Sequence, residues 1–364
     1  METKALDKYK KEMVTCTLCG FCKSVCPVFE HKGWDSSVAR GRILLAYGLL
    51  TGEIEADDSV VDRIFHCPTC NDCYRRCPSK IKTVEIVEAA RKDLRAAGLS
   101  LPKHETMIKN ILEYGNPYGE TENRLEKLDL KPHPAKLGYF IGCTSAYRVE
   151  TNKAVISILE KLGEDFTILD EVCCGSPMKR VGGSDDEQLQ VVNHNLDEIK
   201  KLGIENLIFT CAGCFKMFKL DYPELIGELG FKPMHFLEYL AEKDLKFKPY
   251  PHKVTYHDPC HLGRHAGVYD APRKILEKIP EIEFQEMEKN REFATCCGGG
   301  GGLRIAFPET SGEIAGERIK NAEFAEVITT PCPFCVVNLN TGKELVGSKI
   351  EVKDMIELID ELLE

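Results

Sequence analysis

The spacing of the cysteines constrains this chain more than any other feature of its sequence. All eighteen cysteines among the 364 residues fall into four groups, of four, four, five and five. A chain of this length can bury a core large enough to fold without disulfides, and its charged N-terminus lacks the apolar stretch of a secretory signal. In a reducing compartment, clustered cysteines indicate metal or redox chemistry.

The first two groups share the motif Cys-x2-Cys-x2-Cys-x3-Cys-Pro, which is typical of bacterial ferredoxins. In paired runs of this kind, three thiolates hold one cubane [4Fe-4S] cluster and the fourth crosses to the other cluster. Two zinc sites are the alternative, which two identical four-cysteine runs disfavour. We therefore assign one cubane cluster to Cys16, Cys19, Cys22 and Cys77, and the second to Cys67, Cys70, Cys73 and Cys26.

The residues around these two runs predict a helical N-terminal domain. Apolar residues recur at helical spacing over residues 37–50. A second helix is expected over residues 83–97, with Gly98 ending it. Clusters held among helices resemble those in the iron–sulfur subunits of succinate dehydrogenase and its relatives.

The other two groups repeat one five-cysteine pattern. Equivalent cysteines lie about 120 residues apart, and a glycine follows each double cysteine, which indicates an internal duplication. The two sets are Cys143, Cys173, Cys174, Cys211 and Cys214, and Cys260, Cys296, Cys297, Cys332 and Cys335.

Each repeat is predicted to contain an α/β layer, because strands alternate with helices and the cysteines follow the strand ends. The expected strand, helix and strand are 137–141, 151–162 and 207–210 in the first repeat, and 254–256, 272–278 and 327–330 in the second. The predicted fold is therefore α+β and multidomain. We divide the chain into a helical dicluster domain (1–114), a linker rich in Pro, Gly and charge (115–136), and two α/β repeats (137–250 and 251–364).

Five thiolates per repeat exceed what a zinc ion or a cubane cluster uses. They hold a cluster with a different core, or they leave one thiol free. Adjacent cysteines such as Cys173 and Cys174 project differently along the chain, which disfavours a single cubane. A structural zinc with a spare cysteine and a strained vicinal disulfide are the alternatives.

Several longer segments resemble the cysteine-rich (CCG) repeat proteins typified by heterodisulfide reductase, and the domain order is similar to that of its D-type subunit. The same architecture occurs in the iron–sulfur subunits of glycolate and lactate oxidases. The segments are ARGR at 39–42, GNPYG at 115–119, HDPCHLGRHAGVYDAPR at 257–273, CCGGGGGLRIAFPE at 296–309 and TPCPFC at 330–335.

The resemblance implies a noncubane [4Fe-4S] cluster at each complete five-cysteine set, with a disulfide cleaved between or beside the two. Both sets are complete here, which favours catalysis over conduction alone. The gap of 29 residues between Cys143 and Cys173 is slightly shorter than the family's usual range. One or two noncubane clusters are therefore expected, and zinc remains open for the first repeat.

Candidate substrate and proton groups lie beside the second set, and we assign catalysis to its five cysteines together with His261, Arg264 and His265. These imidazoles and that of His257 could protonate a departing thiolate, and Arg264 could pair with an anionic substrate tail. A hydrogen-bonded structural role is the alternative for each histidine. The glycines at 298–302 either bring backbone N–H groups close to a cluster or form a flexible turn.

The partners follow from what the sequence lacks. We find no flavin or nicotinamide motif and no haem attachment motif, so we expect no flavin, NAD or haem in this chain. A net charge of -10 disfavours nucleic acid, and no apolar run is long enough to span a bilayer. We expect a cytoplasmic chain whose electrons arrive from a flavoprotein or a membrane b-type cytochrome, through which it attaches peripherally to the inner face of the cell membrane.

Two functions remain open from the sequence. The leading hypothesis is an iron–sulfur catalytic subunit that reduces a disulfide of the CoM-S-S-CoB type to two thiols, as in heterodisulfide reductase. The alternative is an electron-transfer subunit that links a flavin-dependent 2-hydroxyacid or acyl-CoA dehydrogenase to a quinone pool.

Overall fold

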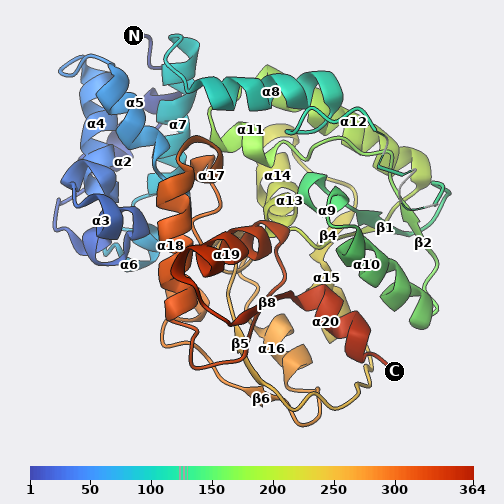
Figure 1. The fold of residues 1–364 in the computed structure, drawn as a ribbon. Coiled ribbons are helices and arrows are strands. Elements are labelled where there is room, and N and C mark those ends of the chain that lie inside the picture. The colour runs from blue at the N-terminus through green and yellow to red at the C-terminus, as the bar shows by residue number, and fades with distance from the viewer. Residues whose placement is uncertain (123, 126–127, 129) are drawn as a thin grey trace.

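The computed structural model describes residues 1–364 except 123, 126–127 and 129. A helical N-terminal part precedes two α/β units built on one plan, which confirms the predicted fold class (Figure 1). Four positions of the expected linker lie outside the described residues. The helices of the N-terminal part are α1 (Lys4–Asp7), α2 (Lys10–Val14), η1 (Phe21–Val25), α3 (Pro27–Lys32), η2 (Asp35–Ser37), α4 (Ala39–Thr51), α5 (Asp58–Phe65), α6 (Asp72–Arg76), α7 (Thr83–Ala96) and α8 (Pro102–Tyr114).

The two units contain corresponding elements in the same order. The first unit comprises β1 (Leu137–Phe140), α9 (Cys143–Ala146), α10 (Val149–Lys161), β2 (Phe166–Ile168), α11 (Ser176–Arg180), α12 (Asp185–Leu202), β3 (Asn206–Phe209), α13 (Ala212–Lys216), η4 (Met217–Asp221), α14 (Tyr222–Ile226), β4 (Lys232–His235) and α15 (Phe236–Ala241). The second comprises β5 (Lys253–Tyr256), η5 (His261–His265), α16 (Asp270–Leu276), β6 (Glu283–Phe284), η6 (Arg291–Phe293), α17 (Leu303–Ala306), α18 (Pro308–Lys320), β7 (Val327–Thr330), α19 (Pro333–Val346), β8 (Glu351–Asp354) and α20 (Met355–Leu362).

Each unit is organised around a parallel four-stranded sheet. The strand orders are β2-β1-β3-β4 and β6-β5-β7-β8, which are the same order in equivalent elements. The expected strands correspond to β1, β3, β5 and β7, and the expected helices to α4, α7, α10 and α16. Cysteines follow the carboxyl ends of β1, β3, β5 and β7, where open α/β sheets place their sites. The edge strands β4 and β8 were not predicted.

The two units pack against each other through equivalent pairs of helices. Helix α10 of the first unit contacts α20 of the second, and α15 of the first contacts α16 of the second. Because α10 corresponds to α16 and α15 to α20, the two contacts are related by an approximate two-fold axis. Buried side chains of both units form shared clusters, such as Tyr139 with Tyr256 and Phe209 with Ile328. This packing turns the cysteine-bearing ends of the two sheets toward one another.

The α10–α20 contact contains a buried carboxyl that makes stability depend on pH. Asp354 is 1% exposed and accepts a hydrogen bond from the Ile356 N–H at 2.9 Å, capping α20. Burial, and then the charge of Glu357, raises the pKa of Asp354 to about 7. Since the carboxyl has a pKa near 4 in the unfolded chain, the folded state binds the proton more tightly, and stability is lost as pH rises through the folded pKa.

We therefore expect the free energy of unfolding to fall between pH 5.5 and 7.5 by at most about 1.4 kcal/mol per pH unit from this group. Asn in Asp354→Asn still caps the helix but cannot ionise, so the variant should lose this component. Urea midpoints across that range measure it. Parallel pH profiles for the wild type and the variant would contradict the assignment.

Among the described residues, no helix is both long and apolar enough to cross a lipid bilayer.

Candidate iron–sulfur sites

The structure brings the first three cysteines of the first run to the last cysteine of the second run. Cys16, Cys19, Cys22 and Cys77 line one small cavity, which Cys73 also borders. Cys19 is exposed, whereas the other three thiols are half-buried. The cavity thus contains the four cysteines of the expected crossed set, and their assignment to one cluster stays a prediction.

The second crossed set is more deeply buried. Burial raises the pKa of the Cys26 thiol, and the charges of Cys67 and Cys70 raise it further. Burial likewise raises the pKa of Cys73, which the charges of Cys70, Cys67 and Cys26 reinforce. Thiols that repel each other as thiolates in this way fit a shared cationic group, because a bound metal stabilises the deprotonated form.

Both runs adopt the same unusual backbone turn. Leu18 and Thr69, at equivalent positions, have φ of 56° and 53°, and the equivalent pair Gly20 and Asn71 has φ of 87° and 65°. Non-glycine residues rarely adopt this left-handed conformation, which costs about 1–3 kcal/mol each. Its repetition in both runs fits a loop that wraps a compact inorganic group and turns its N–H groups inward.

The two five-cysteine sets open on a single cavity of about 170 Å³. Its wall contains nine of the ten cysteines: Cys143, Cys173, Cys174, Cys211, Cys214, Cys260, Cys297, Cys332 and Cys335. Equivalent cysteines of the two units lie together at this cavity, because Cys211 and Cys332 both line its wall and belong to one buried cluster. The duplicated units therefore build one common site, whose thiol-rich wall fits metal clusters.

The surroundings of the two sets differ at the first cysteine of each. In the first unit, Arg124 donates to the Cys143 Sγ at 3.3 Å and to the buried Glu171 at 3.0 Å. Glu171 also accepts from the N–H groups of Ile141 and Gly142. A charged hydrogen-bond network therefore orients the first set.

In the second unit, the helical domain takes the place of that network. The thiol of Cys296, together with burial, raises the pKa of Cys70 from the second cysteine run. Cys70, Cys260 and Cys296 form one buried cluster. Cys67 of the same run belongs to another buried cluster with Cys143 and Cys173 of the first unit, so the second cysteine run adjoins both five-cysteine sets.

Arg264 and His265 do not face this cavity. Arg264 is 2% exposed; it donates to the Cys70 carbonyl at 2.7 Å and to the Ala294 carbonyl. The His265 Nε2 is 2.9 Å from the Thr69 carbonyl oxygen. The guanidinium of Arg264 is thus held by backbone carbonyls, and its pairing with a substrate tail stays a prediction. Both side chains tie the second cysteine run to the second unit.

His257 is also excluded from the cavity wall. Its ligand atom and those of Cys297 and Cys335 lie within 4.8 Å of one another, as in a metal site. However, Arg318 donates from Nε to His257 Nδ1 at 3.2 Å, so the imidazole proton is on Nε2. A protonated Nε2 cannot ligate a metal, and this buried atom has no hydrogen-bond partner among the described residues.

His261 is the predicted histidine that does line the cavity. Its Nδ1 is 3.4 Å from the Cys260 Sγ, and its ring stacks on that of His265 with centroids 4.7 Å apart. The glycines at 299–302 also border the cavity. They place backbone, rather than side chains, beside the cysteines.

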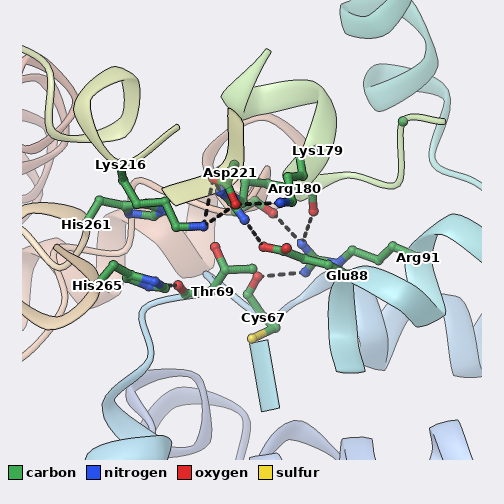
Figure 2. Close-up of polar contacts among 12 residues, drawn as sticks. Cys67, Thr69, Glu88, Arg91, Lys179, Arg180, Lys216, Asp221, His261 and His265 are labelled. Carbon is green, nitrogen blue, oxygen red and sulfur yellow. Dashed lines mark hydrogen bonds and ion pairs between the residues drawn. The ribbon is translucent and has the colours of Figure 1, made fainter. Parts of the chain in front are cut away.

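A buried ion network borders the cavity at Arg180 (Figure 2). Asp221, at the end of η4, accepts from Arg180 and from Lys216, whose Nζ is 2.8 Å from each carboxylate oxygen. Arg180 also pairs with Glu88 of helix α7, joining the helical domain to the first unit. Burial alone would raise the pKa of Asp221, but the charges of Arg180, Lys216 and Lys179 hold it well below its usual range.

Sequence reasoning missed Glu171, Arg124, Asp221 and Arg180. One signal was available for another missed residue, Arg91: it follows Val84 and Val87 and precedes Leu94 on the apolar stripe of the predicted helix at 83–97. A charged residue on such a stripe indicates a buried polar partner.

Comparison with protein families identifies the parts of the chain. Residues 12–81 match the 4Fe-4S dicluster domain, and residues 137–219 and 254–340 each match the Cysteine-rich domain. The chain is 36% identical to the D-type subunit of dihydromethanophenazine:CoB--CoM heterodisulfide reductase from Methanosarcina barkeri, over 97% of this chain and 94% of that protein. The chain belongs to the D-type heterodisulfide reductase family. The D-type subunit of the same reductase from Methanosarcina acetivorans is 38% identical to this chain, over 97% of this chain and 94% of that protein.

Another relative is similar over most of this chain. The B-type subunit of fumarate reductase (CoM/CoB) from Methanothermobacter marburgensis is 32% identical over 96% of this chain and 72% of that protein. Membership of the D-type heterodisulfide reductase family makes this chain an iron–sulfur component of an oxidoreductase, with 4Fe-4S clusters and a role in electron transfer.

Proposed function

We propose that this chain is the catalytic iron–sulfur subunit of a heterodisulfide-reductase-like complex, in which a disulfide is reduced in the cavity between the two cysteine-rich units. The observation that carries the proposal is the convergence of both five-cysteine sets on one cavity. A conducting chain needs its redox centres in series, but it does not need a shared cavity. The relatives' names also support it, since they are reductases of the CoB–CoM heterodisulfide.

Each group of cysteines has a separate part in this proposal. Cys16, Cys19, Cys22 and Cys77 would hold one cubane cluster, and Cys67, Cys70, Cys73 and Cys26 the other. The two five-cysteine sets would hold noncubane clusters. When bound, the clusters supply one-electron transfer and, in the cavity, an iron site for sulfur.

The reaction must consume two electrons and two protons: R–S–S–R′ + 2 e⁻ + 2 H⁺ gives R–SH and R′–SH. The electrons would come from a flavoprotein or a cytochrome that docks on the helical domain. They would reach the second unit where Cys70 and Cys296 lie in one buried cluster with Cys260, which lines the cavity. Cys260, Cys297, Cys332, Cys335 and His261 would surround the sulfur that is cleaved.

A second candidate function is electron transfer between a flavoprotein and quinone, without a disulfide. The similarity to EtfAB:quinone oxidoreductase of Syntrophomonas wolfei favours it, at 29% identity over 83% of this chain and 47% of that protein. The complete cysteine sets and their cavity favour the disulfide reaction.

The test adds a thiol to the oxidised, iron-replete protein and records its EPR spectrum. The proposal predicts a paramagnetic signal that depends on the thiol, because a thiol product must bind the site in the cavity. An unchanged spectrum over a range of chemically different thiols would favour the conducting role. Metal analysis should give about sixteen iron atoms per chain, as four clusters of four irons require, whereas about two zinc ions would indicate structural sites.

A further inference from the structure

One buried arginine lies where the three parts of the chain meet. Arg91 of helix α7 is 0% exposed, and the five N–H groups of its guanidinium share six hydrogen-bond contacts, all to backbone carbonyls. Four of them go to Ile64, Phe65 and Cys67 of the helical domain. The other two go to Arg180 of the first unit at 2.6 Å and to Gly301 of the second at 2.9 Å. Figure 2 shows Arg91 between Cys67 and the ion network.

The three segments that Arg91 joins are each connected to a cysteine group. The Cys67 carbonyl belongs to the run that carries Cys70 to its contact with Cys296. Arg180 ends the short helix that follows Cys173 and Cys174, and Gly301 lies shortly after Cys296 and Cys297. One rigid guanidinium therefore holds both double-cysteine segments and the second cysteine run at fixed positions.

The burial of this charge is costly, since no carboxylate forms an ion pair with Arg91 in the described part of the chain. Burial lowers the pKa of Arg91 to about 10, so the guanidinium is still charged near neutral pH. An apolar side chain would continue the stripe of Val87 and Leu94 without that desolvation cost. Side-chain packing therefore does not account for an arginine at this position, whereas its hydrogen bonds to carbonyls of three segments do.

Close packing on the other side of the junction supports the same role. Gly301 has φ of 62°, and a Cβ there would lie 2.6 Å from the carbonyl carbon of Pro68. Its neighbour Gly302 has its carbonyl oxygen 2.9 Å from the His104 Nε2. The glycine-rich segment therefore packs closely against both the second cysteine run and helix α8.

We propose that Arg91 is a positioning residue that sets the spacing between the second cysteine run and the two five-cysteine sets, and thereby the rate of electron transfer between them. The rate falls steeply with the distance between redox centres, so a small displacement of these segments is sufficient to slow it. This inference rests on the proposed function only in that these cysteines hold redox centres.

The decisive variant is Arg91→Lys, in which the charge stays but a single ammonium cannot reach the carbonyls of all three segments. The reduced holoprotein is mixed with a one-electron oxidant and freeze-quenched, and EPR follows how electrons redistribute among the clusters without substrate. We expect redistribution about 10- to 100-fold slower than in the wild type, with unchanged iron content. Hydrogen–deuterium exchange should rise together in residues 64–68, 180–182 and 300–302.

Arg95→Lys is the matched control, because Arg95 lies one turn further along α7. It pairs with Glu105 and Glu187 rather than with the cysteine segments. Its redistribution rate should equal that of the wild type. An iron-replete Arg91→Lys protein with wild-type rate and exchange would overturn the proposal.

Gly301→Ala tests the junction if Arg91→Lys fails to retain iron. The added Cβ pushes Gly301 away from Pro68, whereas Gly267→Ala introduces similar backbone strain, at φ of 81°, with nothing within 4 Å of the added carbon. The proposal is supported if electron redistribution among the clusters is slow in Gly301→Ala but not in Gly267→Ala. Equal redistribution rates in these two variants refute it. If the wild-type protein reduces no disulfide but the variants still redistribute electrons slowly, the proposed function is refuted and the role of Arg91 stands.

Discussion

Replacing Cys297 by serine is expected to abolish disulfide reduction while the dicluster EPR signals persist. Cys297 is 3% exposed, lines the shared cavity, and has its Sγ 3.4 Å from that of Cys335. Serine cannot supply the thiolate that a cluster in the second unit requires. We expect turnover to fall by about 100-fold or more, since even outer residues of a metal site cost 10–100-fold. Anaerobic assay with a reduced dye as the electron donor measures this loss.

Cys19→Ser provides the complementary result. Cys19 is exposed and lines the small cavity of the first cysteine run rather than the shared one. Its loss should interrupt electron supply but leave the thiol-dependent EPR signal of the shared cavity in place. Retained turnover in an iron-replete Cys297→Ser protein would disprove catalysis at the second unit, whatever the behaviour of Cys19→Ser.

Asp221→Asn is expected to lower the free energy of unfolding by about 3–5 kcal/mol, because it removes the anion shared by buried cations. Asp221 is 3% exposed and faces Arg180 and Lys216. The amide has the same shape as the carboxylate, so the change tests charge rather than volume. The two cations would then be left buried with Glu88 as the remaining carboxylate partner of Arg180. Urea unfolding of iron-replete protein, followed by far-UV circular dichroism, measures the difference.

The control for this prediction is Glu224→Gln in the same network. Glu224 pairs with Lys179 at 3.3 Å, but its side chain is 72% exposed. Exposed ion pairs contribute at most about 1 kcal/mol, so this variant should unfold close to the wild-type midpoint. Equal losses in both variants would contradict the importance of burial in the Asp221 network.

The sequence predicted those parts of the fold that depend on local patterns. Helix α7 and strands β1, β3, β5 and β7 have apolar spacing that is readable within a few residues. Strands β4 and β8 escaped because each lies at a sheet edge and is only half-buried. Edge strands of this kind carry little periodic signal, and their place is decided by pairing with distant β3 and β7.

The candidate site divides in a similar way. Cysteine spacing predicted the groups because ligand chemistry limits both residue type and local geometry. The direction in which each side chain points could not be predicted. Arg264 and His261 lie on the same short element, η5, but only His261 lines the cavity. The bond from Arg91 to Gly301 spans 210 positions in sequence. No local pattern encodes such a partner.

The shared packing of the two units has a consequence for how the chain can be dissected. Tyr139 and Tyr256 belong to one buried cluster, and Phe209 and Ile328 to another, so neither unit has a core that is wholly its own. A fragment that ends between the units would expose both clusters to water at once. The two units should therefore fold and melt as one cooperative body, despite being copies of a single ancestral segment.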